Sequence, residues 1–211
     1  HETGEALYYK NVYKYDAQGN RMKDAAGFDI IESTTTTKNG GEASYYNCGT
    51  ALPDAYGGFG TSLSAYGFDF SMDFVYQIGG KAYDSGYASG MSFSRGMQFH
   101  ADLEKAWNAN NREANVPRIQ YNDVDMARFS DRFLTSASYL NLQNITLGYT
   151  VPVRLITRFG LQNVRVYASG ENLWLWSKRQ GFDPRQSTMG GNSSTQYSPL
   201  RTISGGITIT F

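Results

Sequence analysis

The chain has 211 residues, and its 19 Lys and Arg balance 19 Asp and Glu, so no net charge attracts nucleic acid or an acidic partner. Aromatic residues make up 15% of the chain and Gly is abundant, which favours strands and turns over helices. No apolar run reaches the ~18 residues that a membrane-spanning helix needs. Cys48 is alone, so no disulfide forms within the chain, and the start at His1 suggests a piece of something longer.

Residues 1–57 are polar and rich in turn-forming residues. Residues 6–15 interleave Tyr and Val as a strand does, and a turn follows at residues 16–20. Asp16 and Asn20 fit a calcium loop only in part, because the remaining ligand spacing and the closing Glu are missing. We therefore expect an ordinary turn there, and an elaborated loop or solvated hairpin over residues 34–47.

The clearest strand pattern lies in residues 68–78, where every second side chain is apolar or aromatic: Phe68, Phe70, Met72, Phe74, Tyr76 and Ile78. Residues 59–65 alternate as well, and only Tyr66 and Gly67 separate the two runs. We therefore expect a tight antiparallel hairpin over residues 58–78. Its long aromatic face is excessive for a soluble surface and suits contact with lipid.

Residues 79–136 break the strand pattern for more than fifty residues. Within them, residues 97–108 carry apolar side chains at helical spacing, which predicts a short helix. His100 has no metal ligands at a suitable spacing, so we expect a solvated histidine. A loop of this length is unusual in a compact domain but normal on the outer side of a membrane barrel.

Residues 138–150 predict a strand with a phase slip, because its apolar residues change parity near Gln143 and Asn144. A bulge at that point would keep all of them on one face, whereas without it the upper part would have left the membrane. A short link with an amphipathic turn follows at residues 152–160.

Residues 163–177 predict the next strand. Its outward parity holds Val164, Val166, Ala168 and Gly170, and its inward parity holds Arg165, Tyr167, Ser169 and Glu171. Trp174 and Trp176 keep the outward parity about ten residues further on, close to the ~9–11 residues of a tilted spanning strand. We therefore expect this Trp pair at the membrane interface opposite to that of Tyr149 and Phe211.

The last strand, residues 201–211, has an apolar face of Ile and a hydroxyl-bearing face, and it stops on the aromatic Phe211. Such a strand could bury its apolar face in a soluble sandwich, or turn it to lipid in a barrel. The connections alternate between short (66–67, 151–161) and long (79–136, 181–198). Five strands of this kind predict an all-β fold, the C-terminal antiparallel part of a larger transmembrane β-barrel with long extracellular loops.

Several stretches together resemble the SusC/RagA-like TonB-dependent transporters of the Bacteroidetes outer membrane. They lie at residues 6–10, 52–60, 76–81, 107–108, 116–118, 137–140, 144–149, 166–173 and 201–211. The resemblance implies a barrel of about 22 strands that encloses an N-terminal plug. It also implies import of oligosaccharides or peptides, powered through TonB, together with a SusD-like surface lipoprotein that lids the barrel.

On this interpretation residues 1–57 are an outer loop region, residues 58–78 a hairpin, residues 79–136 a long outer loop and residues 137–211 the last three strands. The plug and the part that contacts TonB are not in this chain. The remaining expected partners are outer-membrane lipid and the barrel-assembly machinery, which would read Phe211. Tyr149, Trp174 and Trp176 would form the aromatic girdle.

The candidate ligand contacts are the lumen-facing Arg165, Tyr167, Ser169 and Glu171, and Trp107 in the long outer loop. Packing against the plug and the neighbouring strands is the favoured explanation for the four lumen-facing residues, and anchoring of the loop explains Trp107 at least as well. A surface-exposed glycan-binding or adhesion β-sandwich is the alternative function. We expect no cofactor, no metal and no enzyme, because Asp102, Glu104 and Glu171 are isolated acids.

Overall fold

The computed structural model describes residues 2–93, 96–121, 123, 125–186 and 197–211. The chain divides into two compact units, His1–Cys48 with Gly86–Phe133, and Gly49–Ser85 with Leu134–Phe211. Each unit has its own sheet and its own buried residues. His1 and much of the polar connection expected at residues 181–198 lie outside the described residues.

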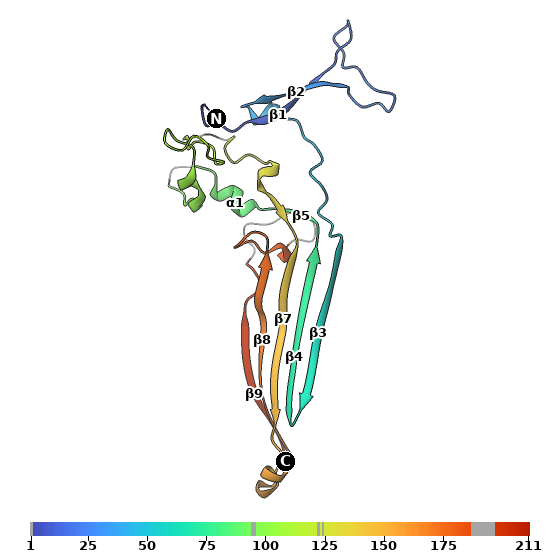
Figure 1. The fold of residues 1–211 in the computed structure, drawn as a ribbon, viewed down its shortest axis with the longest axis vertical. Coiled ribbons are helices and arrows are strands. Elements are labelled where there is room, and N and C mark those ends of the chain that lie inside the picture. Colours follow the sequence, from blue (N-terminus) through green and yellow to red (C-terminus); the bar gives the residue numbers. More distant parts are fainter. Residues whose placement is uncertain (1, 94–95, 122, 124, 187–196) are drawn as a thin grey trace. The chain divides into compact units, whose positions relative to one another are not determined.

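A five-stranded sheet forms the second unit, with the strand order β3-β4-β7-β8-β9 (Figure 1). Its strands are β3 (Ala55–Ala65), β4 (Phe68–Ile78), β7 (Tyr139–Thr150), β8 (Asn163–Ser177) and β9 (Thr202–Thr210). All four neighbouring pairs are antiparallel, and β3 and β9 are the open edges within this chain. The antiparallel all-β fold expected from the sequence is therefore confirmed.

The β3–β4 hairpin turns at two residues, as expected. Tyr66 and Gly67 both have positive φ angles, 53° and 85°, which is the backbone that a tight two-residue hairpin turn requires. β3 begins at Ala55, ahead of the hairpin start expected at residue 58. Its eleven residues pair with all eleven of β4 without interruption.

A β-bulge in β7 confirms the interpretation of the phase slip. Asp73 pairs with Asn144 and Phe74 pairs with Leu142, so Gln143 has no partner on β4. The extra residue restores the parity of the strand, and the apolar residues above and below it share one face. The part of β7 above the bulge stays in the sheet, paired with β4 and β8.

The strand register gathers the apolar residues on one face of the sheet. Phe70 pairs with Leu147, and Leu147 pairs in turn with Ala168. Aromatic rings reinforce this face, because Phe68 and Tyr149 lie 4.5 Å apart between ring centroids. Yet Leu147 remains 52% exposed and Ile203 77% exposed. Within the described residues, nothing covers this apolar face.

The two ends of the sheet differ. At the end with short connections, β7 and β8 are joined by α2 (Val153–Ile156) and η4 (Thr157–Phe159), and the C-terminus lies at the same end (Figure 1). At the other end, β5 (Lys81–Tyr83) pairs with β6 (Leu134–Ser136) at the base of the long loop. The short helix η5 (Pro184–Gln186) follows β8 there. A small core forms around Phe182, together with two alanines of this end.

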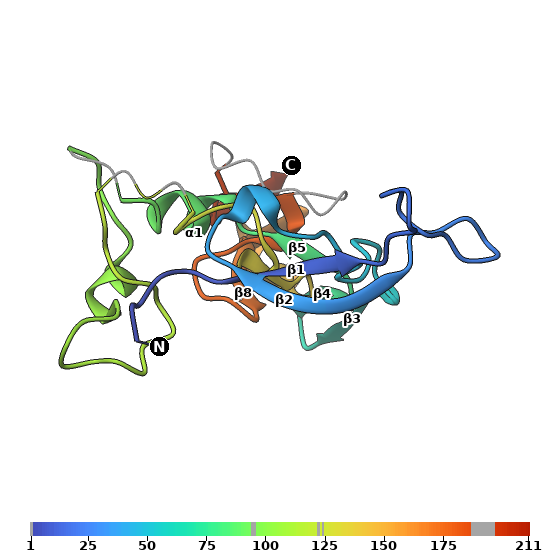
Figure 2. The same cartoon turned by 90° about the horizontal axis from the view of Figure 1, so that it is seen from above.

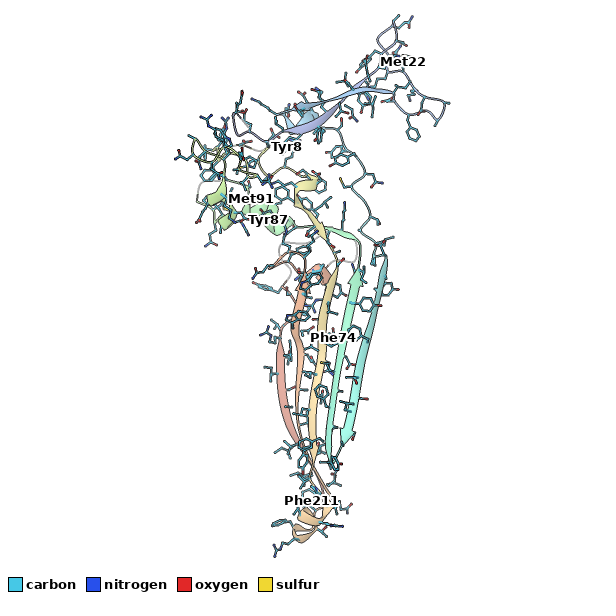
Figure 3. The ribbon with its side chains drawn as sticks, viewed as in Figure 1. Tyr8, Met22, Phe74, Tyr87, Met91 and Phe211 are labelled. Carbon is cyan, nitrogen blue, oxygen red and sulfur yellow. The ribbon has the colours of Figure 1, made fainter. Side chains whose placement is uncertain are left out.

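The first unit contains a two-stranded sheet of β1 (Tyr8–Tyr13) and β2 (Ile31–Thr37), which lie side by side in Figure 2. Its other elements are η1 (Gly40–Glu42), α1 (Ser85–Gly90, from its second residue onward), η2 (Ala101–Lys105) and η3 (Asp131–Phe133). Buried apolar side chains hold these segments together: Ala88, Met91, Leu103, Ala106, Val116, Met126 and Phe133. Figure 3 shows Tyr87 on α1 and Met91 directly after it.

Two expectations for this unit have definite outcomes. Asp16 accepts hydrogen bonds from the backbone of Gln18 and Asn20, at 2.9 and 2.8 Å, so the segment is an ordinary turn. The helix expected over residues 97–108 was wrong in type and length, because only the 3₁₀ turn η2 forms. His100 caps that turn by accepting from the backbone of Asp102, at 3.1 Å. No helix in the described part of the chain is long and apolar enough to cross a membrane.

Candidate functional site

The polar face of the five-stranded sheet is the first candidate site. The register aligns Asp69, Gly148 and Tyr167 across three strands. Arg165, Tyr167, Ser169 and Glu171 all lie on this face, as expected from their parity. The structure adds the carboxylates of β4, which were not expected in the candidate site.

An ion pair crosses the central strand of this face. Arg165 donates from Nε to Asp69 Oδ1 at 3.1 Å, and a second bond joins Nη2 to Oδ2. The two residues stand on β8 and β4, with β7 between them. Gly148 provides the space for this ion pair, because a Cβ there would lie 2.5 Å from both Asp69 oxygens and 2.6 Å from Arg165 Nη2. A bidentate carboxylate fixes the guanidinium plane as well as its position.

Tyr167 continues this arrangement toward the edge strand β9. The Arg165 guanidinium carbon lies 5.4 Å from the centre of the Tyr167 ring, within cation–π range. The ring lies over Gly206, where a Cβ would approach its atoms to 2.7 Å. Glycines at positions 148 and 206 therefore let long side chains lie flat across the polar face. The result is an ordered charged and aromatic surface.

Further along the same face, hydroxyls and acids follow. Ser169 and Ser204 share a hydrogen bond of 2.9 Å between their Oγ atoms. In the next row Asn144 lies between Asp73 on one side and Glu171 on the other. This surface offers many hydrogen-bond donors and acceptors, as expected for a face in contact with water or with a polar ligand.

A buried polar network closes the other end of the face, where the segment after β8 folds back. Asn141 is only 1% exposed, and its amide nitrogen donates to Gln143 at 2.9 Å. Asn172, at φ 52°, accepts from Arg185 at 3.1 Å. Arg185 also holds Asp183 through two bonds, Nε to Oδ1 at 2.9 Å and Nη2 to Oδ2 at 2.7 Å.

Asp183 is charged in this network. Burial by itself raises the pKa of this carboxyl, but the hydrogen bonds and the charge of Arg185 outweigh burial and hold the pKa below its ordinary value. This network was not expected from the sequence. A positive φ at Asn172 is invisible in an otherwise regular strand pattern, and Asp183 lies in a connection without periodicity.

A groove in the first unit is the second candidate site, with a volume of ≈ 720 Å³. Its lining includes aromatic side chains and several polar or charged groups: Tyr45, Tyr46, Trp107, Phe129, Arg128, Asp131 and Arg132. Tyr46 donates to Asp131 at 2.5 Å, and this hydrogen bond raises the pKa of the Tyr46 hydroxyl. Rings beside hydrogen-bonding groups suit an elongated polar ligand.

Trp107 has a definite position at this groove. Its ring lies against Gly4, where a Cβ would come within 2.3–2.7 Å of the ring atoms, and its backbone N–H donates to Val116 at 2.9 Å. Gly4 has a φ of 69°, which suits glycine. The side chain therefore packs two distant segments of this unit together while also lining the groove.

The expected girdle residues lie at opposite ends of the apolar face. Tyr149 pairs with Phe68 next to the hairpin turn, whereas Trp174 and Trp176 pair with Leu142 and Leu140 beyond the bulge. Phe211 follows directly after β9 and is 81% exposed (Figure 3). Among the described residues, no three metal-ligating side chains come together.

Known proteins resemble the chain in sequence and in fold. TonB-dependent receptors P3 and P26 of Formosa agariphila are each 30% identical over 173 residues, which is 77% of this chain and 17% of each receptor. A chain in the structure of the RagAB peptide transporter superposes with a TM-score of 0.72 and 26% identity over 99% of this chain and 21% of that chain. No protein-family model matches the chain.

A chain of the RagAB peptide importer in its closed-closed state superposes with a TM-score of 0.69 and 24% identity, which bears on the fold. The chain spans less than a quarter of the length of each of these relatives. Their likeness agrees with the antiparallel sheet, its opposite polar and apolar faces, and the resemblance found in the sequence. The chain is thus a fragment of a SusC/RagA-like TonB-dependent transporter.

Proposed function

We propose that this chain is part of an outer-membrane active transporter that imports oligosaccharides or peptides with energy supplied through TonB. One observation carries the proposal: a regular antiparallel sheet keeps a long apolar face uncovered and a charged, hydroxyl-rich face opposite to it. Lipid outside and a wet lumen inside satisfy both faces, as in transmembrane barrels. The likeness to TonB-dependent receptors supports TonB as the route by which energy reaches the transporter.

Within this proposal, the parts of the chain have distinct roles. Residues 58–78 and 137–211 supply five spanning strands, and residues 1–57 and 79–136 form outer loops. Tyr149 marks one membrane interface, and Trp174 and Trp176 mark the other. The strands upstream, the plug and the segment that contacts TonB belong to the rest of the transporter.

Substrate would meet two surfaces of this chain. On the polar face, Arg165, Tyr167, Ser169 and Glu171 contact either substrate or the plug. In the outer loops, the groove around Trp107 offers rings and hydrogen-bonding groups to an elongated ligand. The RagAB relatives are a peptide transporter and importer, which favours peptides over oligosaccharides as the substrate class. A SusD-like surface lipoprotein is the proposed lid.

The test begins with the native membrane protein. Its intact mass, measured beside the bands that co-purify, should be several times 23.5 kDa, and a lipoprotein should accompany it. Cells that lack the gene should then lose uptake of labelled peptides, and cells that lack TonB should lose it to the same extent. Uptake that persists without TonB would overturn the proposal.

Phe211 is the proposed signal for barrel assembly. It is an exposed aromatic residue that directly follows β9. We expect Phe211→Ala to lower the amount of membrane-inserted protein several-fold, with Phe211→Tyr as the control that keeps the ring. Quantitative blotting of outer-membrane fractions measures this effect. Normal insertion of the alanine variant would remove the role.

A further inference from the structure

The short link between β7 and β8 carries apolar and cationic side chains in separate stripes. In α2 and η4, Leu155 and Phe159 stand four residues apart, and so do Arg154 and Arg158. Side chains four apart share one side of a helical turn, so each pair forms its own stripe. Ile156, between the two pairs, is buried.

The apolar stripe is uncovered. Leu155 is 64% exposed and Phe159 73% exposed, and Val153 adds to the same exposed link. A connection of this kind in a soluble protein is normally polar. Phe211 is exposed at the same end of the sheet (Figure 1), where the backbone of Gln162 donates to Thr210 at 2.8 Å.

The cationic stripe lacks a partner within the described residues. Neither Arg154 nor Arg158 takes part in an ion pair there, and residues 151–170 contain no acid. The nearby ends of the strands carry the Phe68–Tyr149 ring contact on the apolar face. The link therefore adds exposed apolar side chains and positive charge at the end of the sheet where the apolar face ends.

We propose that α2 and η4 form an interfacial foot that lies in the phospholipid headgroup layer at the short-turn end of the barrel. Leu155 and Phe159 enter the acyl boundary, and Arg154 and Arg158 pair with anionic phosphates. A helical segment with apolar residues beside basic ones binds membrane surfaces in this way. Charge complementarity and continuity with the lipid-facing strands select lipid over a protein partner. The inference rests on the proposed barrel.

The test uses the full-length transporter reconstituted in bilayers that contain phosphatidylglycerol. A nitroxide is placed on a single cysteine at position 155 or 159, in a background that includes Cys48→Ser. Leu147 on the apolar face is the lipid reference, and Gln18 in an exposed turn is the water reference. Accessibility to oxygen and to a nickel chelate is then measured at each position.

We expect labels at 155 and 159 to favour oxygen over nickel several-fold relative to the label at Gln18. Replacing phosphatidylglycerol by phosphatidylcholine should reduce that preference, and the double variant R154Q/R158Q should abolish its dependence on lipid charge. If the label at 155 behaved like the label at Gln18, α2 and η4 would be exposed to water. If neither reagent reached it, they would be covered by protein. Either result would overturn the proposal. A preference that does not depend on lipid charge would overturn the role of the arginines. A label at Leu147 that fails to favour oxygen would instead overturn the barrel itself.

Discussion

The two units of this chain are stabilised by different means. Among its described residues, the unit of residues 1–48 and 86–133 buries seven apolar side chains, including Phe133 at 0% and Met91 at 1% exposure. The five-stranded sheet has long, regular backbone pairing but leaves most of its apolar face open. A loop unit with its own core can stand in water. A sheet with an open apolar face needs an apolar medium around it, and in the proposed barrel that medium is lipid.

The largest expected effect on stability comes from a substitution in the core of the first unit. Phe133→Ala removes a fully buried ring, and we expect the local free energy of unfolding to fall by about 3–5 kcal/mol. Hydrogen exchange of amides in residues 86–133 measures the change. Phe28→Ala, at a position 71% exposed, is the matched control and should change stability by less than about 0.5 kcal/mol. Equal effects would show that no core holds this unit.

A charge on the apolar face sharpens the contrast between the units. Ile145→Arg and Thr146→Arg alter neighbouring, half-buried positions on opposite faces of β7. In lipid the first should cost about 2–4 kcal/mol near the bilayer midplane, and the second should cost little. The fraction of folded, heat-resistant barrel in outer-membrane extracts measures the difference. Similar yields from both variants would mean that lipid does not contact the Ile145 face.

Acid should loosen the segment after β8 before it affects the strands. The native state holds the pKa of Asp183 below its unfolded value, so the carboxylate contributes stability above an unfolded pKa of about 3.9 and loses it as pH falls. Loss of the charged hydrogen bonds to Arg185 should cost about 1.5–3 kcal/mol. Protease cleavage within residues 181–186 should rise below about pH 4. Asp183→Asn should abolish that pH dependence, and a retained dependence would assign it to another group.

The smallest effect concerns the ion pair on the polar face. Gly148→Ala places a methyl group between Asp69 and Arg165, while Gly205→Ala meets only an ordinary contact of 3.4 Å. Because about a third of each charged side chain is exposed, the pair should contribute less than about 1 kcal/mol. Chemical denaturation of each variant, with and without Asp69→Asn, isolates this contribution. If Asp69→Asn does not reduce the cost of Gly148→Ala, the methyl group acts elsewhere.

The sequence was sufficient for the strands because alternation is a local signal. The parity of residues 68–78 predicted one apolar face, and the phase slip at Gln143 predicted the bulge. Loop structure was harder, because the apolar spacing over residues 97–108 predicted a helix, whereas η2 has only five residues and ends before Ala106. The alternation that marks a strand repeats every two residues and can be read locally, whereas the conformation of a loop depends on contacts with residues far along the chain.

The candidate sites show the same limit. Parity placed Arg165 and Tyr167 on the polar face, but their partners lie far along the chain. Asp69 is 96 residues from Arg165, and only the register across β7 brings them together at Gly148. The contact of Trp107 with Gly4 is likewise beyond sequence reasoning, because neither segment has a periodic pattern.

A label scan along β9 tests the central claim most directly. Nitroxides placed one at a time at positions 203–209 of the full-length transporter in bilayers should alternate with a period of two. Positions 203, 205, 207 and 209 should favour oxygen, and positions 204, 206 and 208 should favour the nickel chelate. If the odd positions were closed to both reagents, the apolar face would be the core of a soluble sandwich, and the barrel would be contradicted.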